Sequence, residues 1–95
     1  MQKYELTVVL PGKTTAAKKK NAVSRIEKIV ETLGGKIIKS EDWGEKELAY
    51  KIAKNTSGVY LYFELEITKK AISGLNDKIK LEDDIIRHLL VRKES

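Results

Sequence analysis

The chain has 95 residues, which is enough for one domain over residues 1–95 with a single modest core. It has no cysteine, which excludes a disulfide framework and a thiolate metal site, and no apolar run long enough for a membrane span. A formal charge of +5 moderately favours a polyanionic partner. Because the N-terminus lacks the apolar block of a signal peptide, we expect an intracellular, cytoplasmic protein.

The first half of the chain predicts a strand, a helix and a second strand. Lys3 to Leu10 alternates apolar and polar residues, the pattern of a half-buried strand. From about Thr15 to Leu33 the apolar residues fall at spacings of three and four, which is typical of a helix. Thr14 or Thr15 is a candidate cap for its start, and Gly34-Gly35 for its end. A second strand is expected from Ile37 to about Lys54.

This second strand is interrupted at Trp43-Gly44, where the only tryptophan stands among charged residues. Glycine inside a strand often marks a bulge, and a long strand needs such a bend to stay on a twisted sheet. Alternation resumes at Leu48, Tyr50 and Ile52. We expect Trp43 to be a peripheral core residue; the alternative is an exposed side chain that stacks on RNA bases.

The second half predicts a strand, a helix and a last strand. Residues 55–58 form a turn cluster, and Val59 to Ile67 alternates as regularly as any part of the chain. Thr68 is expected to cap the second helix, residues 81–84 to end it, and Ile85 to Lys93 to form the last strand. The order β-α-β-β-α-β predicts an α+β, ferredoxin-like split β-α-β sandwich, with a four-stranded antiparallel sheet and two helices on one face.

No residue pattern indicates catalysis, a cofactor or a metal site. The only histidine, His88, lies in phase with apolar residues of the last strand, so a structural role is expected. The glycines form neither a P-loop nor a GxGxxG pattern, and no serine stands in a GxSxG elbow. The acids of residues 82–84 and the lysines of residues 18–20 are interpreted as solvated side chains.

The sheet face opposite the helices is the candidate functional surface, because nothing in the chain is left to cover it. Strand alternation places ten side chains there: Lys3, Glu5, Thr7, Val9, Tyr60, Tyr62, Glu64, Arg87, Leu89 and Val91. Its aromatic residues are similar to those of RNA-recognition sheets, but glutamates beside them repel phosphate. Outward Leu89 and Val91 on an edge strand favour protein docking instead.

The stretch WGEKELAYKI, residues 43–52, resembles the Trp-Gly-basic-basic-x-Leu-Ala-Tyr-x-Ile signature of the bacterial small-ribosomal-subunit protein six family. Tyr4-Glu5, Leu10-Pro11, Gly58-x-Tyr60 and the closing run from Ile85 to Arg92 agree with it. The resemblance spans roughly residues 2 to 93. It implies a non-enzymatic protein that binds 16S ribosomal RNA as a heterodimer with ribosomal protein eighteen, among other components of the small subunit. Some members carry acidic C-terminal extensions; this sequence ends at Ser95, so contacts of such a tail are not expected.

Charge, strand phase and the resemblance together assign the candidate contacts. The basic residues expected to contact RNA phosphates are Lys3, Lys46, Arg87, Arg92 and Lys93. The protein-partner interface is expected at Tyr60, Tyr62, Leu89 and Val91. Because Glu45 stands where the family often has a basic residue, Lys46 has to supply the phosphate contact at the bend.

Two other functions stay open on fold alone. The main alternative is a small-molecule-binding regulatory domain that acts as a homodimer. An acylphosphatase-like hydrolase ranks last, because it needs an arginine after the first strand and residues 11–14, Pro-Gly-Lys-Thr, have none. No membrane and no small-molecule substrate is expected for the favoured function.

Overall fold

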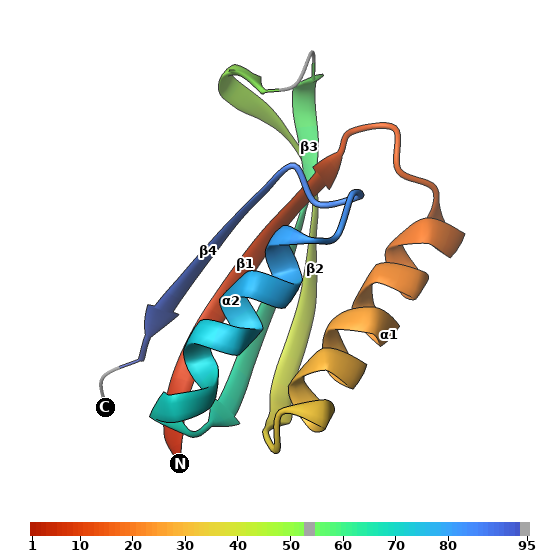
Figure 1. Cartoon of the computed structure of the whole chain (residues 1–95). Coiled ribbons are helices and arrows are strands. Elements are labelled where there is room, and N and C mark those ends of the chain that lie inside the picture. Colours follow the sequence, from red (N-terminus) through yellow and green to blue (C-terminus); the bar gives the residue numbers. More distant parts are fainter. Residues whose placement is uncertain (53–54, 94–95) are drawn as a thin grey trace.

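The fold is a four-stranded sheet with both helices on one side (Figure 1). The computed structural model describes residues 1–52 and 55–93, with side chains for residues 1–48 and 56–93. The elements are β1 (Gln2–Pro11), α1 (Ala16–Thr32), β2 (Lys36–Ile52), β3 (Asn55–Ile67), a short 3-10 helix η1 (Lys69–Ala71), α2 (Ile72–Lys80) and β4 (Arg87–Arg92). The strand order is β2-β3-β1-β4 and all pairings are antiparallel, which confirms the predicted ferredoxin-like sandwich.

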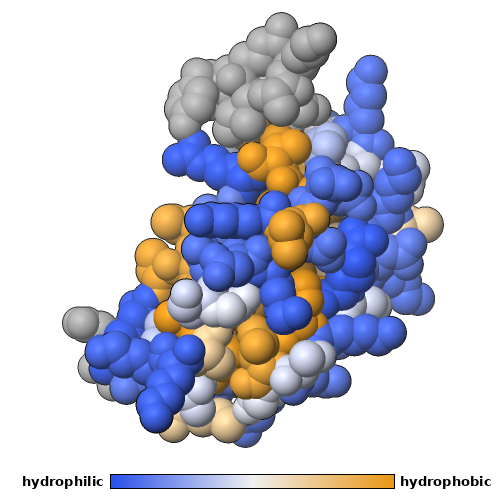
Figure 2. Space-filling model, in the orientation of Figure 1, coloured by the Kyte–Doolittle hydropathy of each residue, from blue (hydrophilic) through white to orange (hydrophobic). Residues whose placement is uncertain are grey.

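The core lies between the sheet and the helices. Alternate residues of β1 and β3 supply most of it, including the fully buried Leu6 and Phe63. From the helices come Ala22, Ile26 and Val30 of α1 and Leu75 and Ile79 of α2. Seen from the helix side, hydrophilic side chains cover most of the surface and apolar ones reach it in patches (Figure 2). Apolar residues that recur every second position in the strands and every three or four in the helices therefore form one apolar layer.

Helix α1 begins and ends where the sequence predicts. The Thr15 side chain accepts a hydrogen bond from the Lys18 amide at 3.2 Å, which satisfies one of the free donors of the first turn. At the other end Gly34 has a φ of +83°, the left-handed conformation that glycine adopts without strain. The amides of Gly34 and Gly35 donate to carbonyls of the last turn, so the helix stops there.

The predicted boundary of the second helix is wrong at its start. Thr68 makes no side-chain cap hydrogen bond, and the chain first forms η1 before α2 begins at Ile72. The last strand is also shorter than expected, since β4 begins at Arg87 rather than Ile85. Ile86 still donates its amide to the Val9 carbonyl at 2.9 Å, so the chain is held against β1 before the strand proper begins.

The turn predicted over residues 55–58 is wrong as well, because β3 already begins at Asn55. Ser57 and Gly58 pair with β2, opposite Glu47 and Lys46. Gly58 is needed for close packing rather than for a turn: a Cβ at this position would lie 2.4 Å from Cγ1 of Val9. The β2–β3 hairpin consequently extends past the helices (Figure 1).

In the part of the chain that the structure describes, neither helix is long and apolar enough to cross a membrane.

Candidate functional site

The open face of the sheet is built from the residues that alternate with the core. Cross-strand pairs place Thr7 beside Tyr62 and Leu89, and Val9 beside Tyr60 and Arg87. The next row toward the chain ends joins Glu5 with Glu64 and Val91. All ten side chains that the sequence assigns to this face occupy positions of the same strand phase.

Val9 is the exception in burial, because it lies on the open side but is only 5% exposed. Its side chain packs against Gly58, beside paired Tyr60 and Arg87. The open face therefore has an apolar floor at one end, where the β2–β3 hairpin begins to project.

Trp43 lies on the open face and is not a peripheral core residue, which corrects the sequence-based expectation. Its ring stacks on Tyr62, with centroids 4.8 Å apart and an interplanar angle of 10°. The side chain is 43% exposed. The β2–β3 register shifts between Ile37 and Lys39, so Glu41 pairs with Tyr62 on the open face and alternation puts Trp43 on the same side. A second shift follows between Asp42 and Gly44, where Gly44 has a φ of +79°. The predicted bulge at Gly44 is thus confirmed.

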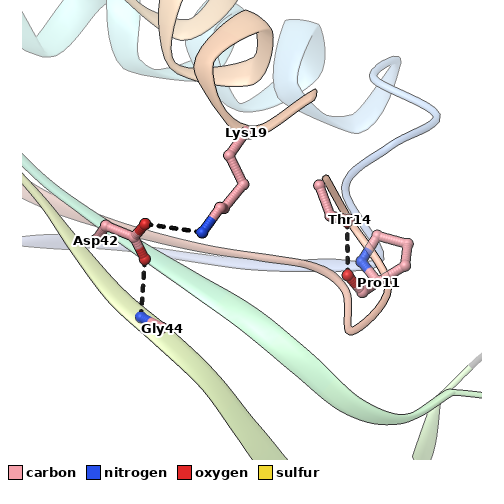
Figure 3. Close-up of polar contacts among 5 residues, drawn as sticks. All are labelled: Pro11, Thr14, Lys19, Asp42 and Gly44. Atoms are coloured by element: carbon pink, nitrogen blue, oxygen red, sulfur yellow. Dashed lines mark hydrogen bonds and ion pairs between the residues drawn. The ribbon is translucent and has the colours of Figure 1, made fainter. Parts of the chain in front are cut away.

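Asp42 holds this bulge from the helix side (Figure 3). Its Oδ1 accepts a hydrogen bond from the Gly44 amide at 2.8 Å, and its Oδ2 accepts one from the Lys19 ammonium at 3.1 Å. The Gly44 amide and then the Lys19 ammonium lower the pKa of Asp42. Lys19 belongs to α1, so the contact joins the helix layer to the edge strand at the position where Trp43 turns to the other side. The other lysines of the run, Lys18 and Lys20, are exposed.

Lys46 lies above two of the aromatic rings. Its Nζ is 5.4 Å from the ring centroid of Trp43 and 5.6 Å from that of Tyr60, within the range of cation–π attraction. The ammonium group of Lys46 therefore lies over the open face, next to the Trp43–Tyr62 stack. The residue that the sequence assigned to phosphate contact is thus placed beside the aromatic patch.

Apolar side chains of β4 complete the patch. Leu89 is 61% exposed and Val91 is 42% exposed, whereas Leu90 between them packs against the core. Leu89 lies in the same row of the sheet as Tyr62. We name this set the open-face patch: Trp43, Tyr60, Tyr62, Leu89 and Val91.

Acidic residues border the open-face patch on the side of the chain ends. Lys93 donates to Glu64 Oε1, and this contact lowers the pKa of Glu64 and raises that of Lys93. Burial, and then the charges of Glu5 and Glu64, raise the pKa of Tyr62. Carboxylates therefore lie close to the aromatic stack on this side, and they repel the phosphates of RNA.

The five basic residues expected to contact RNA do not form one cluster. Lys3 and Arg87 lie on the open face, and Lys46 lies over the aromatic rings. Lys93 is bonded to Glu64. Arg92 pairs with Tyr4 and so shares the strand phase of the core side, at the outer edge of the sheet.

Nothing in the described chain gathers three or more side chains that could bind a metal ion. Two of the three acids of residues 82–84 are bonded elsewhere: Arg25 contacts Glu82 at 2.9 Å and Asp84 at 2.7 Å. His88 is half-buried on β4, with Nε2 2.7 Å from Asn76 Oδ1 of α2. Burial, and then the charge of Lys80, lower the pKa of His88.

The fold and this face define the class of the protein: a small α+β binding domain whose helix-free sheet face carries aromatic, apolar and charged side chains. The model of the family described as ribosomal protein S6 matches residues 3–92. A small ribosomal subunit protein bS6 of Pelagibacter ubique is 35% identical over 92 residues, which cover 97% of this chain and 76% of the relative. The bS6 of Lactiplantibacillus plantarum is 34% identical, with 98% of this chain and 95% of the relative covered.

The solved structures agree with the sequence relatives. The crystal structure of 30S ribosomal protein S6 from Thermotoga maritima superposes with a TM-score of 0.89 at 27% identity, covering 97% of this chain and 87% of that one. The chain belongs to the ribosomal protein S6 family, as its sequence indicates. It is therefore a structural, non-enzymatic component of the small ribosomal subunit.

Proposed function

We propose that this protein binds 16S ribosomal RNA in the cytoplasm as a heterodimer with ribosomal protein eighteen, within the small subunit. The open-face patch contacts the partner protein, and basic side chains at the rim of the same face contact phosphates. The RNA then meets a surface to which both proteins contribute. Other small-subunit components lie around this pair.

The observation that carries the proposal is the open-face patch itself. Leu89 and Val91 lie on the outer side of an edge strand, and the exposed indole of Trp43 extends the apolar surface to the opposite edge of the sheet. The fold gains little from side chains that stay in water, whereas a partner gains the area that it covers. Aromatic and apolar residues with charges around them are typical of the centre and rim of a protein interface.

The charges of the face support a shared rather than an independent RNA site. Glu5 and Glu64 separate Lys3 from Lys46 and Arg87, which lie near Tyr60 at the other end of the face. Lys93 is already bonded to an acid. Affinity for RNA depends mainly on the number of phosphates that are neutralised. The isolated chain offers few of these contacts, so the heterodimer is expected to bind more tightly than either protein alone.

The experiment compares three samples on one RNA, a fragment of the 16S central domain: the chain alone, ribosomal protein eighteen alone, and both together. Binding is measured at several salt concentrations. We expect weak binding by the chain alone and much tighter binding by the pair, with a steeper dependence on salt. Tight, sequence-selective binding by the isolated chain would contradict the proposal. Sedimentation of the free chain as a stable homodimer would favour the regulatory-domain alternative.

A further inference from the structure

Four acids lie on the open face among the residues whose side chains the structure describes, and lysines compensate three of them. Glu64 is bonded to Lys93 and has Lys39 opposite it on β2. Glu41 forms an ion pair with Lys39, 3.7 Å between Nζ and Oε1. Glu66 stands between Lys3 and Lys36 in the cross-strand pairing. Each of these three carboxylates has a cation beside it that the chain itself provides.

Glu5 is different. On the described part of this face, it is the acid that has neither an ion pair nor a lysine in the opposite position. Its cross-strand neighbours are Glu64 on β3 and Val91 on β4. The charge of Glu5 helps to raise the pKa of Lys93, but Lys93 is bonded to Glu64. Like charges directly opposite each other destabilise a sheet, so the stability of the fold does not explain an acid at position 5 opposite Glu64.

Glu5 also occupies an interior strand, beside the exposed side chains of β4. A partner that covers Leu89 and Val91 removes water from this carboxylate at the same time. Burying an ionised carboxylate without a cation is expensive. The partner surface must therefore bring a positive charge to this position, between the apolar side chains that pack on β4.

An arginine meets these requirements better than a lysine. Its planar guanidinium can donate two parallel hydrogen bonds to one carboxylate, is less strongly hydrated than an ammonium, and packs on aromatic rings such as Tyr62. We infer that Glu5 is a specificity-determining residue of the open face, and that it accepts an arginine guanidinium from the protein partner. The inference rests on the proposed docking function and names the chemistry of the partner at that site.

The test measures the affinity of the full chain for purified ribosomal protein eighteen by calorimetry. We expect Glu5→Gln to weaken binding about ten- to a hundredfold, as for the loss of a charge-assisted hydrogen bond. The matched control is Glu66→Gln, which removes an acid of the same face that the chain itself compensates, and it should change affinity less than about twofold. The melting temperature of Glu5→Gln should stay close to that of the natural chain, because the lost repulsion from Glu64 is offset by the lost attraction to Lys93.

A charge swap then identifies the partner residue. Glu5→Arg is combined with each arginine and each lysine of the partner changed in turn to glutamate. We expect one of the arginine changes to raise the affinity of the Glu5→Arg chain at least tenfold. Restoration only by a changed lysine, or by no position, would overturn the arginine pair.

The outcomes separate the inference from the function on which it rests. If the natural chain binds the partner and Glu5→Gln binds equally well, the inference is overturned and the proposed function stands. If the natural chain does not bind the partner, both fail. If Glu5→Gln instead strengthens binding of the 16S fragment, and that RNA displaces the partner, the open face is an RNA surface and the inference is wrong.

Discussion

The two faces of the same sheet differ by a single step along each strand. On β3, Phe63 is fully buried against the helices, whereas Tyr62 and Glu64 on either side of it point to the open face. The helix side is apolar from Tyr4 to Leu10 of β1 and from Val59 to Ile67 of β3, and no described polar residue is buried there. The open side mixes aromatic rings, exposed aliphatic residues and an opposed pair of acids. One face thus accounts for stability, and the other carries features that stability alone does not explain.

The largest effect is expected on the helix side. Phe63→Ala should lower the free energy of unfolding by about 3–5 kcal/mol, because it leaves a large cavity among fully buried apolar side chains. Urea unfolding followed by circular dichroism measures this loss. Tyr62→Ala, one residue away on the open face, is the matched control and should cost no more than about 1.5 kcal/mol through the lost ring stack. Equal losses of unfolding free energy for the two variants would mean that both faces contribute alike to stability.

The second effect concerns binding rather than folding. Leu89→Asp should weaken the complex with ribosomal protein eighteen at least tenfold, because a charge then enters the apolar centre of the interface. The same variant should change the free energy of unfolding by less than about 0.5 kcal/mol, since Leu89 is mostly exposed. Calorimetric titration and urea unfolding of one preparation give both values. A loss of stability without a loss of affinity would place Leu89 among the structural residues.

A smaller effect is expected at the bulge that joins the two faces. Gly44→Ala should cost about 1–2 kcal/mol, because a side chain disfavours the positive φ of this position even though nothing crowds the added Cβ. Gly34→Ala, another positive-φ glycine with free space around it, is the matched control for backbone strain and should cost a similar amount. Only Gly44→Ala should also weaken partner binding, since it disturbs the Trp43–Tyr62 stack. Equal affinities for the two variants would show that this stack is not part of the interface.

The smallest effect is a dependence of stability on pH. The pKa of folded His88 lies below its ordinary value near 6.5, chiefly because the ring is partly buried. The unfolded chain therefore binds the proton more readily, so the contribution of the neutral ring is fully present above pH 6.5 and is lost as the pH falls through the folded pKa. His88→Gln should flatten this part of the profile, measured as urea midpoints between pH 5 and 7.5. An unchanged slope would assign the pH dependence to another group.

The alternation of residues predicted both faces, because a strand has a strict period of 2 and β1, β3 and β4 keep it. All the residues expected on the open face lie there, and the apolar face of β3 from Val59 to Ile67 is buried as expected. The sequence motif likewise identified the family from a short stretch of β2. These predictions succeed because they depend on local spacing or on a shared signature.

Two of the errors share a physical cause, because each depends on pairing or packing between distant parts of the chain. Trp43 lies outside the core because the register shift between Ile37 and Lys39 puts Glu41, and Trp43 with it, on the open face of β2. Asp42 between them contacts Lys19 of α1, 23 positions away. Gly58 follows a run typical of a turn, but in the structure its missing side chain leaves room for the Val9 side chain on the neighbouring strand. Residues 37–39, Ile-Ile-Lys, contain no glycine to signal the first register shift, so the side on which Trp43 lies could not be read from the sequence.

The placement of Trp43 gives the protein a built-in optical reporter. The chain has one indole, and that indole lies outside the core on the surface proposed for docking. Covering it moves the ring from water into an apolar environment, which shortens its emission wavelength. Association can then be followed on the natural chain without an attached dye, while Phe63, deep on the other side of the sheet, is silent at the wavelengths that excite tryptophan.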